Sequence, residues 1–217
     1  GYLELTGPLG EKAYASVDDQ MRPTSVTPTD GASVSIERDG KGRPTRIQSD
    51  GYSSVQDQTP VSSTRFAQMT YHATGNGKGQ LASITNALGQ ESKFEYDAKG
   101  QLTNSAGPDG KSVEYRYDPV GNMTSLRTPA GVEHRFSWNA INNPASYDIA
   151  SKATTWIYNL DRELTKITRP GGQSIAITYD LGGRPSSIQH GQGTTNITYD
   201  NVGAPTSIAL GNNKIAI

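Results

Sequence analysis

Acidic side chains recur along this chain at positions where they could do chemistry. Asp97 and Asp118 lie 21 residues apart, and Asp180 and Asp200 lie 20 residues apart. Paired carboxylates can serve acid–base catalysis, glycoside hydrolysis or calcium binding. Each of these aspartates, however, stands at the same place in a recurring turn, where its side chain can accept backbone N–H groups. A residue that appears at every turn is explained by the turn, so we predict no catalytic carboxylate.

Other chemical motifs are incomplete. Residues 110–112 (Gly-Lys-Ser) look like the end of a phosphate-binding loop, but Ser105 stands where the first glycine belongs and a strand follows instead of a helix. No Gly-x-Ser-x-Gly elbow is present for a serine nucleophile. Three scattered histidines lack metal-ligand spacing: His72, His134 and His190. The sequence therefore predicts no catalytic, cofactor-binding or metal site, and hence no enzyme.

Composition argues against a thick two-layer core. Only 33% of the 217 residues are hydrophobic, and the chain holds 24 glycines and 12 prolines. Regular alternation of polar and apolar residues nevertheless argues against disorder. A single curved sheet reconciles the two observations, because each of its strands needs only one covered face.

Charge and cysteine content limit the partners. The net charge of −1 gives no bulk attraction to nucleic acid or to an anionic membrane. No apolar run approaches the roughly 20 residues that span a bilayer. Cysteine is absent, which excludes disulfides and thiolate metal sites. Because the chain starts at Gly1 and not at Met, we expect it to be a piece of a larger protein.

A repeat of 20 or 21 residues organises the chain from about residue 94 onward. Its first position is aromatic: Tyr96, Tyr117, Trp138, Tyr158, Tyr179 and Tyr199. Its second position can build an Asx turn: Asp97, Asp118, Asn139, Asn159, Asp180 and Asp200. Three residues later the turn requires a positive φ, and the sequence has Gly100, Gly121, Asn142, Arg162, Gly183 and Gly203. Arg162 departs from this pattern.

Strands of about five residues flank each turn. Val113, Tyr115 and Tyr117 alternate with polar residues, which predicts a strand with one covered face. In the return strand Leu164 and Ile167 lie three residues apart, so strict pleating would point them to opposite faces. Either both faces are partly covered or a bulge intervenes. We favour the use of both faces.

The pattern Tyr-Asp-x-x-Gly-x-Leu-Thr at residues 96–103 resembles the YD repeats of RHS-repeat proteins. That family includes the shell-forming repeats of RHS polymorphic toxins and related insecticidal toxin-complex and adhesion proteins. The resemblance implies an all-β repeat architecture of consecutive antiparallel β-hairpins that form a curved sheet, part of a YD-repeat shell or spiral. It also implies structural roles for the aromatic, Asx and glycine positions of the six units.

The resemblance covers the chain unevenly. Residues 1–70 match weakly as degenerate repeats, in which Val17 and Arg38 stand where tyrosine would, with an inserted loop at about residues 49–63. Residues 71–217 form one region of regular YD repeats. In the family, a core motif with Asp-Pro-x-Gly elements accompanies self-cleavage. Residues 118–121 carry that string, but another repeat follows, so we interpret it as a turn.

The resemblance implies a non-catalytic structural segment of a shell that encapsulates a toxin cargo. The implied partners are the remaining repeats of the parent protein or a second shell chain, and the enclosed toxin domain. The expected location is secreted or at the cell surface, after export by a bacterial secretion system. The alternative is a cell-surface interaction module that binds glycan or a partner protein through its sheet, with Trp138 and Trp156 exposed for stacking. Burial of the aromatics distinguishes the two.

Overall fold

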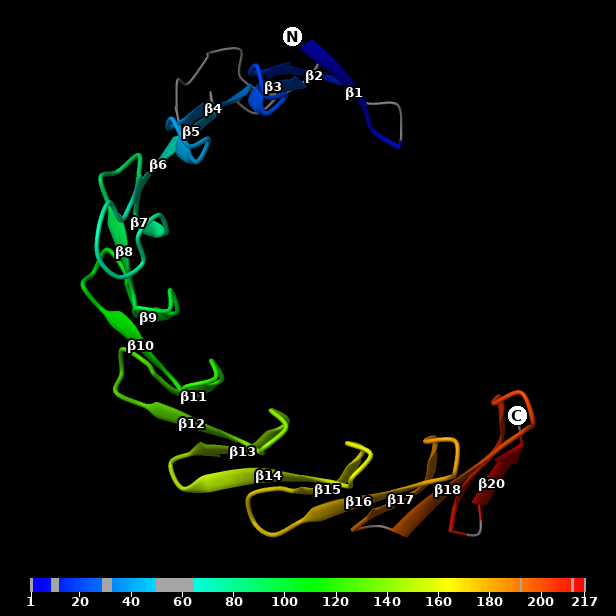
Figure 1. Ribbon diagram of the computed structural model, residues 1–217. Helices are drawn as coiled ribbons and strands as arrows, with labels where there is room; N and C mark the ends of the chain where they lie inside the picture. Colours follow the sequence, from blue (N-terminus) through cyan, green and yellow to red (C-terminus); the bar gives the residue numbers. More distant parts are fainter. Residues whose placement is uncertain are drawn as a thin grey trace, which may run out of the picture. The chain divides into compact units, whose positions relative to one another are not determined.

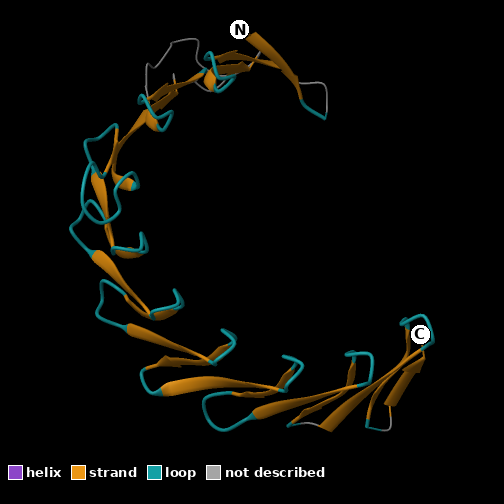
Figure 2. Cartoon of the chain, viewed as in Figure 1, coloured by secondary structure: helices purple, strands orange, loops and turns teal. Residues whose placement is uncertain are grey.

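The computed structural model describes residues 2–8, 12–28, 33–49, 65–191, 193–211 and 213–216. Within these ranges the regular structure consists of β-strands joined by turns (Figure 2), which confirms the all-β prediction. The described ranges accordingly contain no helix with the length and apolar character needed to cross a membrane. Contacts divide the chain into two units, Gly1–Val113 and Glu114–Ile217.

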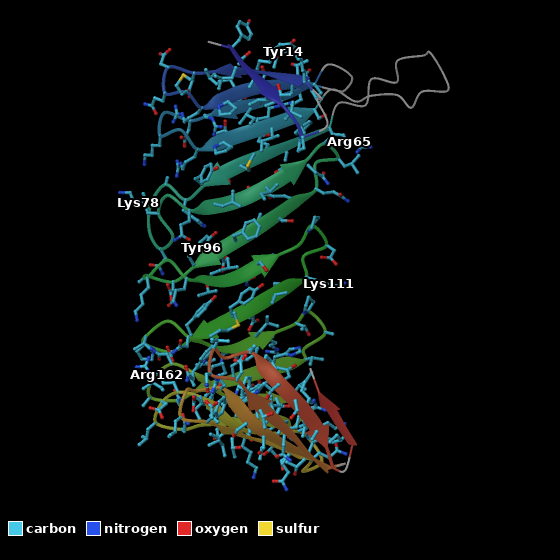
Figure 3. The ribbon with its side chains drawn as sticks, turned by 90° about the vertical axis from the view of Figure 1, so that its right-hand side faces the viewer. Tyr14, Arg65, Lys78, Tyr96, Lys111 and Arg162 are labelled. Carbon is cyan, nitrogen blue, oxygen red and sulfur yellow. The ribbon has the colours of Figure 1, made fainter. Side chains whose placement is uncertain are left out.

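Unit 1 is a run of antiparallel strands in which each strand pairs with the next one along the chain (Figure 1). The turns at its two edges are well separated, with Lys78 at one edge, Arg65 and Lys111 at the other, and Tyr96 between them (Figure 3). Its strands are β1 (Tyr2–Thr6), β2 (Lys12–Val17), β3 (Pro23–Pro28), β4 (Val34–Arg38), β5 (Pro44–Ser49), β6 (Arg65–Tyr71), β7 (Leu81–Asn86), β8 (Glu91–Tyr96) and β9 (Leu102–Ala106).

Unit 2 repeats the same arrangement, and β10 (Ser112–Tyr117) contains the boundary between the units. Its further strands also pair in sequence order. They are β11 (Met123–Arg127), β12 (Glu133–Trp138), β13 (Pro144–Ile149), β14 (Lys152–Tyr158), β15 (Leu164–Thr168), β16 (Ser174–Tyr179), β17 (Pro185–His190), β18 (Gly193–Tyr199), β19 (Pro205–Leu210) and β20 (Asn213–Ala216).

A bulge sits beside the repeat aromatic in each hairpin. In β14–β15, Trp156 pairs with Ile167 and Tyr158 with Leu164, and the register shifts between Ile157 and Tyr158. Because Trp156 and Tyr158 share a face, so do Leu164 and Ile167. The expectation that both faces are covered by these apolar residues was therefore wrong. The bulge turns a spacing of three into a spacing compatible with one apolar face.

The opposite face carries hydroxyl groups. Ser137 and Ser146 lie directly opposite each other on β12 and β13, and their Oγ atoms are 2.6 Å apart. Thr198 and Ser207 form the same kind of pair at 2.9 Å on β18 and β19. These hydrogen bonds satisfy polar side chains on a face that has no second layer of protein over it in the described structure.

Burial is correspondingly shallow. The buried residues in the described part of the chain are Ala15, Gly77, Ser83, Ser125 and Ser207, and no large side chain there is fully buried. A two-layer domain would bury many leucine, isoleucine and aromatic side chains. The prediction of a single sheet in place of a thick core is therefore confirmed.

The degenerate repeats fold like the regular ones. Beside Val17 and Arg38 the hairpins show the same bulge as beside the aromatics. The predicted inserted loop at about residues 49–63 lies outside the described residues except for Ser49, which ends β5. The division into residues 1–70 and 71–217 remains a prediction.

Candidate functional site: the repeated turn and its links to the next repeat

Asp118 illustrates how each repeat turn closes. Its backbone N–H donates to the carbonyl of Asn122 at 2.9 Å, and the N–H of Gly121 donates to the Asp118 carbonyl at 3.1 Å. Its Oδ1 atom accepts the N–H groups of Val120 at 3.0 Å and of Asn122 at 2.9 Å. The predicted Asx turn is therefore present, and it accounts for this carboxylate without catalysis.

The third residue after the Asx position has a positive φ in all six regular turns. Gly121 has a φ of 101°, while Asn142 and Arg162 have φ values of 61° and 67°. The other three turns have glycine there with φ between 75° and 91°: Gly100, Gly183 and Gly203. Arg162 thus departs from the sequence pattern but adopts the same left-handed conformation, which L residues can reach at some cost.

The carboxyl pKa is lowered in several Asx turns, among them those of Asp39, Asp118 and Asp180. The hydrogen bond from the Arg184 side chain holds the pKa of Asp180 below its ordinary value, as Arg43 does for Asp39. Burial raises the pKa of Asp118, but hydrogen bonds from the Asn122 side chain and from backbone N–H groups outweigh it. These carboxyl groups are therefore ionised acceptors, which suits turn closure and not proton donation.

In three repeats the residue just before the return strand links its turn to the next one. Asn122 donates through Nδ2 to Asp118 Oδ2 at 3.0 Å and to Oδ1 of Asn142 in the following turn at 2.9 Å. In unit 1, Arg43 donates through Nη1 to the Gly79 carbonyl at 2.7 Å, and Gln80 reaches the Gly100 carbonyl at 2.9 Å. We call these pre-strand residues.

In two successive turns of unit 2 the charge of the pre-strand residue complements the turn residue that it contacts. Arg184 donates through Nε to Asp180 Oδ2 at 2.8 Å. In the preceding turn the roles are reversed, since Asn159 donates through Nδ2 to Glu163 Oε2 at 2.7 Å. An arginine facing aspartate and a glutamate facing asparagine both complete the hydrogen bond. These positions were not predicted from the sequence, although the exchange of the Asp180–Arg184 pair for Asn159–Glu163 in the preceding repeat could have revealed them.

The repeat aromatics also connect neighbouring hairpins. Tyr179 donates its hydroxyl to the Leu164 carbonyl at 2.8 Å, and Trp138 donates Nε1 to the Met123 carbonyl at 2.8 Å. Each acceptor is the first residue of the return strand in the preceding repeat. The guanidinium of Arg184 lies 4.6 Å from the centre of the Tyr199 ring, so a pre-strand arginine also covers the next aromatic.

The structure places the six predicted aromatics at one equivalent position and half-buries all of them: Tyr96, Tyr117, Trp138, Tyr158, Tyr179 and Tyr199. Arg38, where the sequence lacks the aromatic, donates through Nη2 to the Pro23 carbonyl at 3.1 Å and so keeps the same type of link. Trp156 is half-buried as well. The exposed tryptophans expected of a sugar-binding face are therefore not found at these two positions.

The incomplete chemical motifs have structural roles in the fold. Gly110 has a φ of 76° in the turn before β10, a strand, so residues 110–112 lack the helix N-terminus of a phosphate site. His134 Nδ1 lies 2.7 Å from the Tyr147 hydroxyl, and His72 Nε2 lies 2.8 Å from the Phe94 carbonyl. In the described ranges no group of three or more His, Cys, Asp or Glu is arranged to hold a metal ion.

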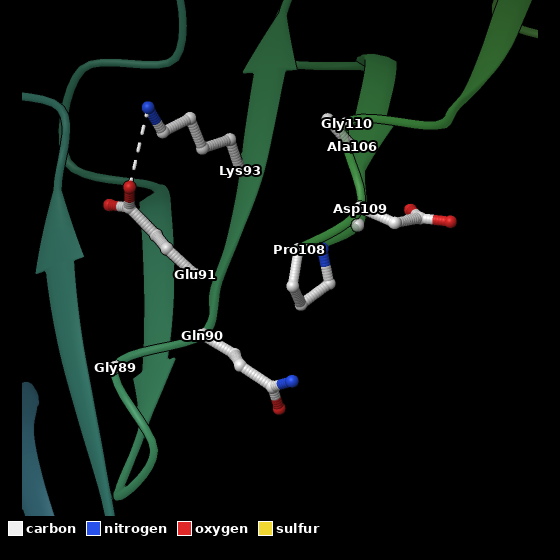
Figure 4. Close-up of a pocket in the computed structure, with 9 residues that line it drawn as sticks. Gly89, Gln90, Glu91, Lys93, Ala106, Pro108, Asp109 and Gly110 are labelled. Carbon is white, nitrogen blue, oxygen red and sulfur yellow. Dashed lines mark ion pairs between the residues drawn. The ribbon is translucent and has the colours of Figure 1, made fainter.

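An open hollow of about 760 Å³ lies between two turns of unit 1, where residues 89–93 and 106–110 contribute its lining (Figure 4). Glu91 and Lys93 form an ion pair of 3.3 Å at its side. A hydrogen bond from Ser83, followed by Lys93, lowers the pKa of Glu91. An ionised and paired carboxylate is a poor general acid, so Glu91 is not poised for acid catalysis.

Bulged hairpins with Asx turns, repeated along one sheet, define the class of YD-repeat proteins of the RHS type. The family model described as "Teneurin YD-shell" matches residues 10–216, and the chain belongs to this family. Its role is accordingly that of a structural shell segment. No curated protein sequence matched the chain.

Two solved structures share the fold. A TcdB2-TccC3-Cdc42 crystal structure is 16% identical with a TM-score of 0.59, covering 90% of this chain and 12% of its own. The Photorhabdus luminescens Tc holotoxin pore carrying a TccC3 mutation is 14% identical with a TM-score of 0.57, covering 94% and 14%. The chain thus spans about an eighth of the length of these proteins.

Proposed function

We propose that this chain is a non-catalytic stretch of wall in an RHS/YD-repeat shell that encloses a toxin cargo. The observation that carries the proposal is that contacts between neighbouring hairpins hold the sheet together, without a central core. Each hairpin is held by hydrogen bonds to the hairpins before and after it, and the sheet is one layer thick. Such a sheet can extend to any length without a central core, which is what a wall requires.

The description of the family and one similar solved structure support the proposal that the wall encloses a toxin cargo. The family is described as a shell, and one of the similar structures is a Tc holotoxin pore. The partners in this proposal are the remaining repeats of the parent protein or a second shell chain, together with an enclosed toxin domain. A cargo of this kind acts outside the producing cell, so we infer a secreted or cell-surface location reached through a bacterial secretion system.

Protease protection of the cargo in the intact parent protein tests the proposal. Replacing Tyr117 and Tyr179 by alanine should loosen the links between repeats and let protease reach the cargo, while the intrinsic activity of the cargo stays the same. Tyr2→Ala is the matched control, because the Tyr2 side chain is 83% exposed in β1. If protease digests the cargo as fast in the unmodified parent as in the variant with Tyr117 and Tyr179 replaced, the shell proposal is wrong.

The alternative, a glycan- or protein-binding surface module, predicts a different result. In that case the parent would bind a defined sugar or protein through the aromatic face, and the Tyr179→Ala change would abolish binding without altering protease sensitivity. The half-burial of the repeat aromatics and their hydrogen bonds to backbone carbonyls favour the wall.

A further inference from the structure

Ser125 lacks the hydroxyl partner that serines at the same position have in four other hairpins. In those hairpins the residue before the repeat aromatic faces the serine, with the two hydroxyl oxygens between 2.6 and 2.9 Å apart: Thr70–Ser83, Ser137–Ser146, Thr178–Ser187 and Thr198–Ser207. In β10–β11 the residue opposite Ser125 is Arg116. Ser125 is only 9% exposed, yet its hydroxyl forms no hydrogen bond in the described structure. A bound group that satisfies this hydroxyl would remove the cost of leaving it unpaired.

Ser125 lines a small hollow on the face of the sheet that carries the hydroxyl pairs. We call this face the hydroxyl face. Ser125 lies opposite Arg135 on β12, and Arg135 is two residues from Ser137, so Ser125 shares the face of Ser137. The hollow has a volume of about 150 Å³, more than a single water molecule needs. Its other lining residues are all charged: Glu114, Arg116, Arg127 and Glu133.

The charges around the hollow are not balanced. Glu133 is already paired, since Arg135 Nη2 lies 2.7 Å from Glu133 Oε2. Arg116 and Arg127 form no ion pair with any described residue, although Glu114 stands opposite Arg127 in the strand register. These three arginines and two glutamates leave one positive charge in excess. The hollow therefore favours a ligand group with a single negative charge.

A carboxylate fits the hollow better than a phosphate. Guanidinium groups bind both anions through paired N–H donors, and a serine hydroxyl can donate to either. A phosphate ester, however, carries between about 1.5 and 2 negative charges, and Glu114 and Glu133 beside the hollow would repel it. A carboxylate carries one charge, and its two oxygens can accept hydrogen bonds from Arg116 and Ser125 together.

The carboxylate has to come from a chain that lies over the hydroxyl face. β11 pairs with β10 on one side and with β12 on the other, so the strand below the hollow has no free edge to which a further strand could add. A neighbouring repeat of the same sheet therefore cannot supply the group by strand pairing. In a closed wall, the chain that lies over the inner face is the cargo.

We propose that Arg116, Ser125 and Arg127 bind an aspartate or glutamate side chain of the enclosed cargo. The proposal rests on the proposed shell function, and it names the chemistry through which the wall holds its cargo. It also makes the hydroxyl face of unit 2 the inner face of the wall.

Zero-length crosslinking in the full-length parent with its cargo tests the site. Arg116→Lys keeps the positive charge and places a primary amine in the hollow. A water-soluble carbodiimide activates a carboxylate in contact with that amine, the amine attacks the activated carbon, and an amide forms as the urea leaves. We expect mass spectrometry to find a cargo peptide joined through an aspartate or glutamate to position 116. The reagent is increased until Lys93 couples to Glu91, 3.3 Å away, because Lys93 lies opposite Ser83 on the hydroxyl face.

Ile157→Lys is the matched control. Ile157 also precedes a repeat aromatic, is 53% exposed and stands opposite Lys166, so no carboxylate-binding arginine or serine surrounds it. We expect a cargo yield at Arg116→Lys on the order of tenfold above that at Ile157→Lys, because a charge-assisted hydrogen bond changes occupancy by about that factor. Adding Ser125→Ala to Arg116→Lys should lower the yield by about fivefold, which proximity to the cargo alone would not explain.

Three results would overturn the site. They are coupling of position 116 only to Glu114, Glu133 or a part of the parent other than the cargo, a yield equal to that of Ile157→Lys, and a yield that Ser125→Ala leaves unchanged. The outcome is separable from that of the shell function. If the cargo is protected from protease but couples equally in both lysine variants, the site is wrong and the shell stands. If the cargo couples at Arg116→Lys but protease digests it freely in the unmodified parent, the site stands and the shell function is wrong.

Discussion

The turns of unit 1 and unit 2 share their backbone hydrogen bonds but differ in the side chains at their tips. In the Asp39 turn of unit 1 the second residue after the aspartate is Lys41, whose N–H donates to Asp39 Oδ1. In the Asp180 turn of unit 2 the corresponding donor is Gly182, and the first residue after the aspartate is the fully exposed Leu181. Both turns pair the aspartate with a pre-strand arginine, Arg43 or Arg184. The difference shows that the Asx, positive-φ and pre-strand positions build the turn, while the tip is free to serve another purpose.

The largest effect is expected at the positive-φ position. Gly121 has a φ of 101°, outside the left-handed region open to other residues, while Arg162 lies inside it at 67°. We expect Gly121→Val to lower the free energy of unfolding by about 1–3 kcal/mol. Arg162→Val should cost less, although it is also strained. Equal denaturation midpoints for the two variants would show that the turns do not share this requirement.

The charge pairing of the pre-strand residue should have the next largest effect. Asn159→Asp would place two carboxylates where Asn159 now donates to Glu163 at 2.7 Å, and we expect a loss of about 1 kcal/mol of stability. The double change Asn159→Asp with Glu163→Arg recreates the Asp180–Arg184 arrangement and should recover that loss. Thermal unfolding of the unmodified protein, the single variant and the double variant measures both changes. If the double variant unfolds at the same temperature as Asn159→Asp, the complementary pairing of the two residues does not stabilise the turn.

Acid should weaken both units through the same carboxylates. The pKa values of Asp39 and Asp180 are lowered in the folded state, first by hydrogen bonds from Arg43 and Arg184. Their stabilisation is therefore complete above the unfolded-state pKa, near 3.9, and is lost as the pH falls through the folded-state value. We expect the unfolding temperature to fall below about pH 4, and to fall less in Asp180→Asn. A rise in the unfolding temperature on acidification would contradict the prediction that these carboxylates stabilise the fold in their ionised form.

The smallest effect is expected from exchanging tips. Lys41→Leu gives a unit 1 turn the tip chemistry of unit 2, while the Gly42 N–H bond to the Asp39 carbonyl should persist. We expect hydrogen exchange at the Gly42 amide to report a change within about 0.5 kcal/mol, as for a surface substitution. Markedly faster exchange would mean that the tip does take part in turn closure.

The turns were predictable from sequence because their chemistry is local. Asp118 contacts groups within four residues of itself, so residue type and spacing were sufficient. The conformation at Arg162 was less obvious. The residue is not glycine, yet its backbone has the same positive φ as the glycines of the other turns. The repeats at Val17 and Arg38 were hard to recognise because they lack the aromatic residue. Their turns still close, since the aspartate that follows each of these residues makes the turn hydrogen bonds.

Contacts between repeats could not be predicted in the same way. The link from Asn122 to Asn142 and the hydrogen bond from Tyr179 to the Leu164 carbonyl join residues that come together only when hairpins pack side by side. A single sequence shows which residues recur but not which of them touch across 20 residues. The full exposure of Leu160 and Leu181 could not be predicted either, because the sequence does not show whether a hydrophobic turn residue packs against a neighbouring element or faces solvent.

Accessibility of the two sheet faces in the intact parent tests the wall most directly. Ile157 and Ile208 lie on opposite faces, are 53% and 37% exposed, and can each be replaced by cysteine in a protein whose other cysteines have been removed. A polymer-linked maleimide too large to enter a closed shell should modify one of these cysteines at once and the other only after the shell is opened by denaturant. Equal modification of both in the intact protein would contradict a wall.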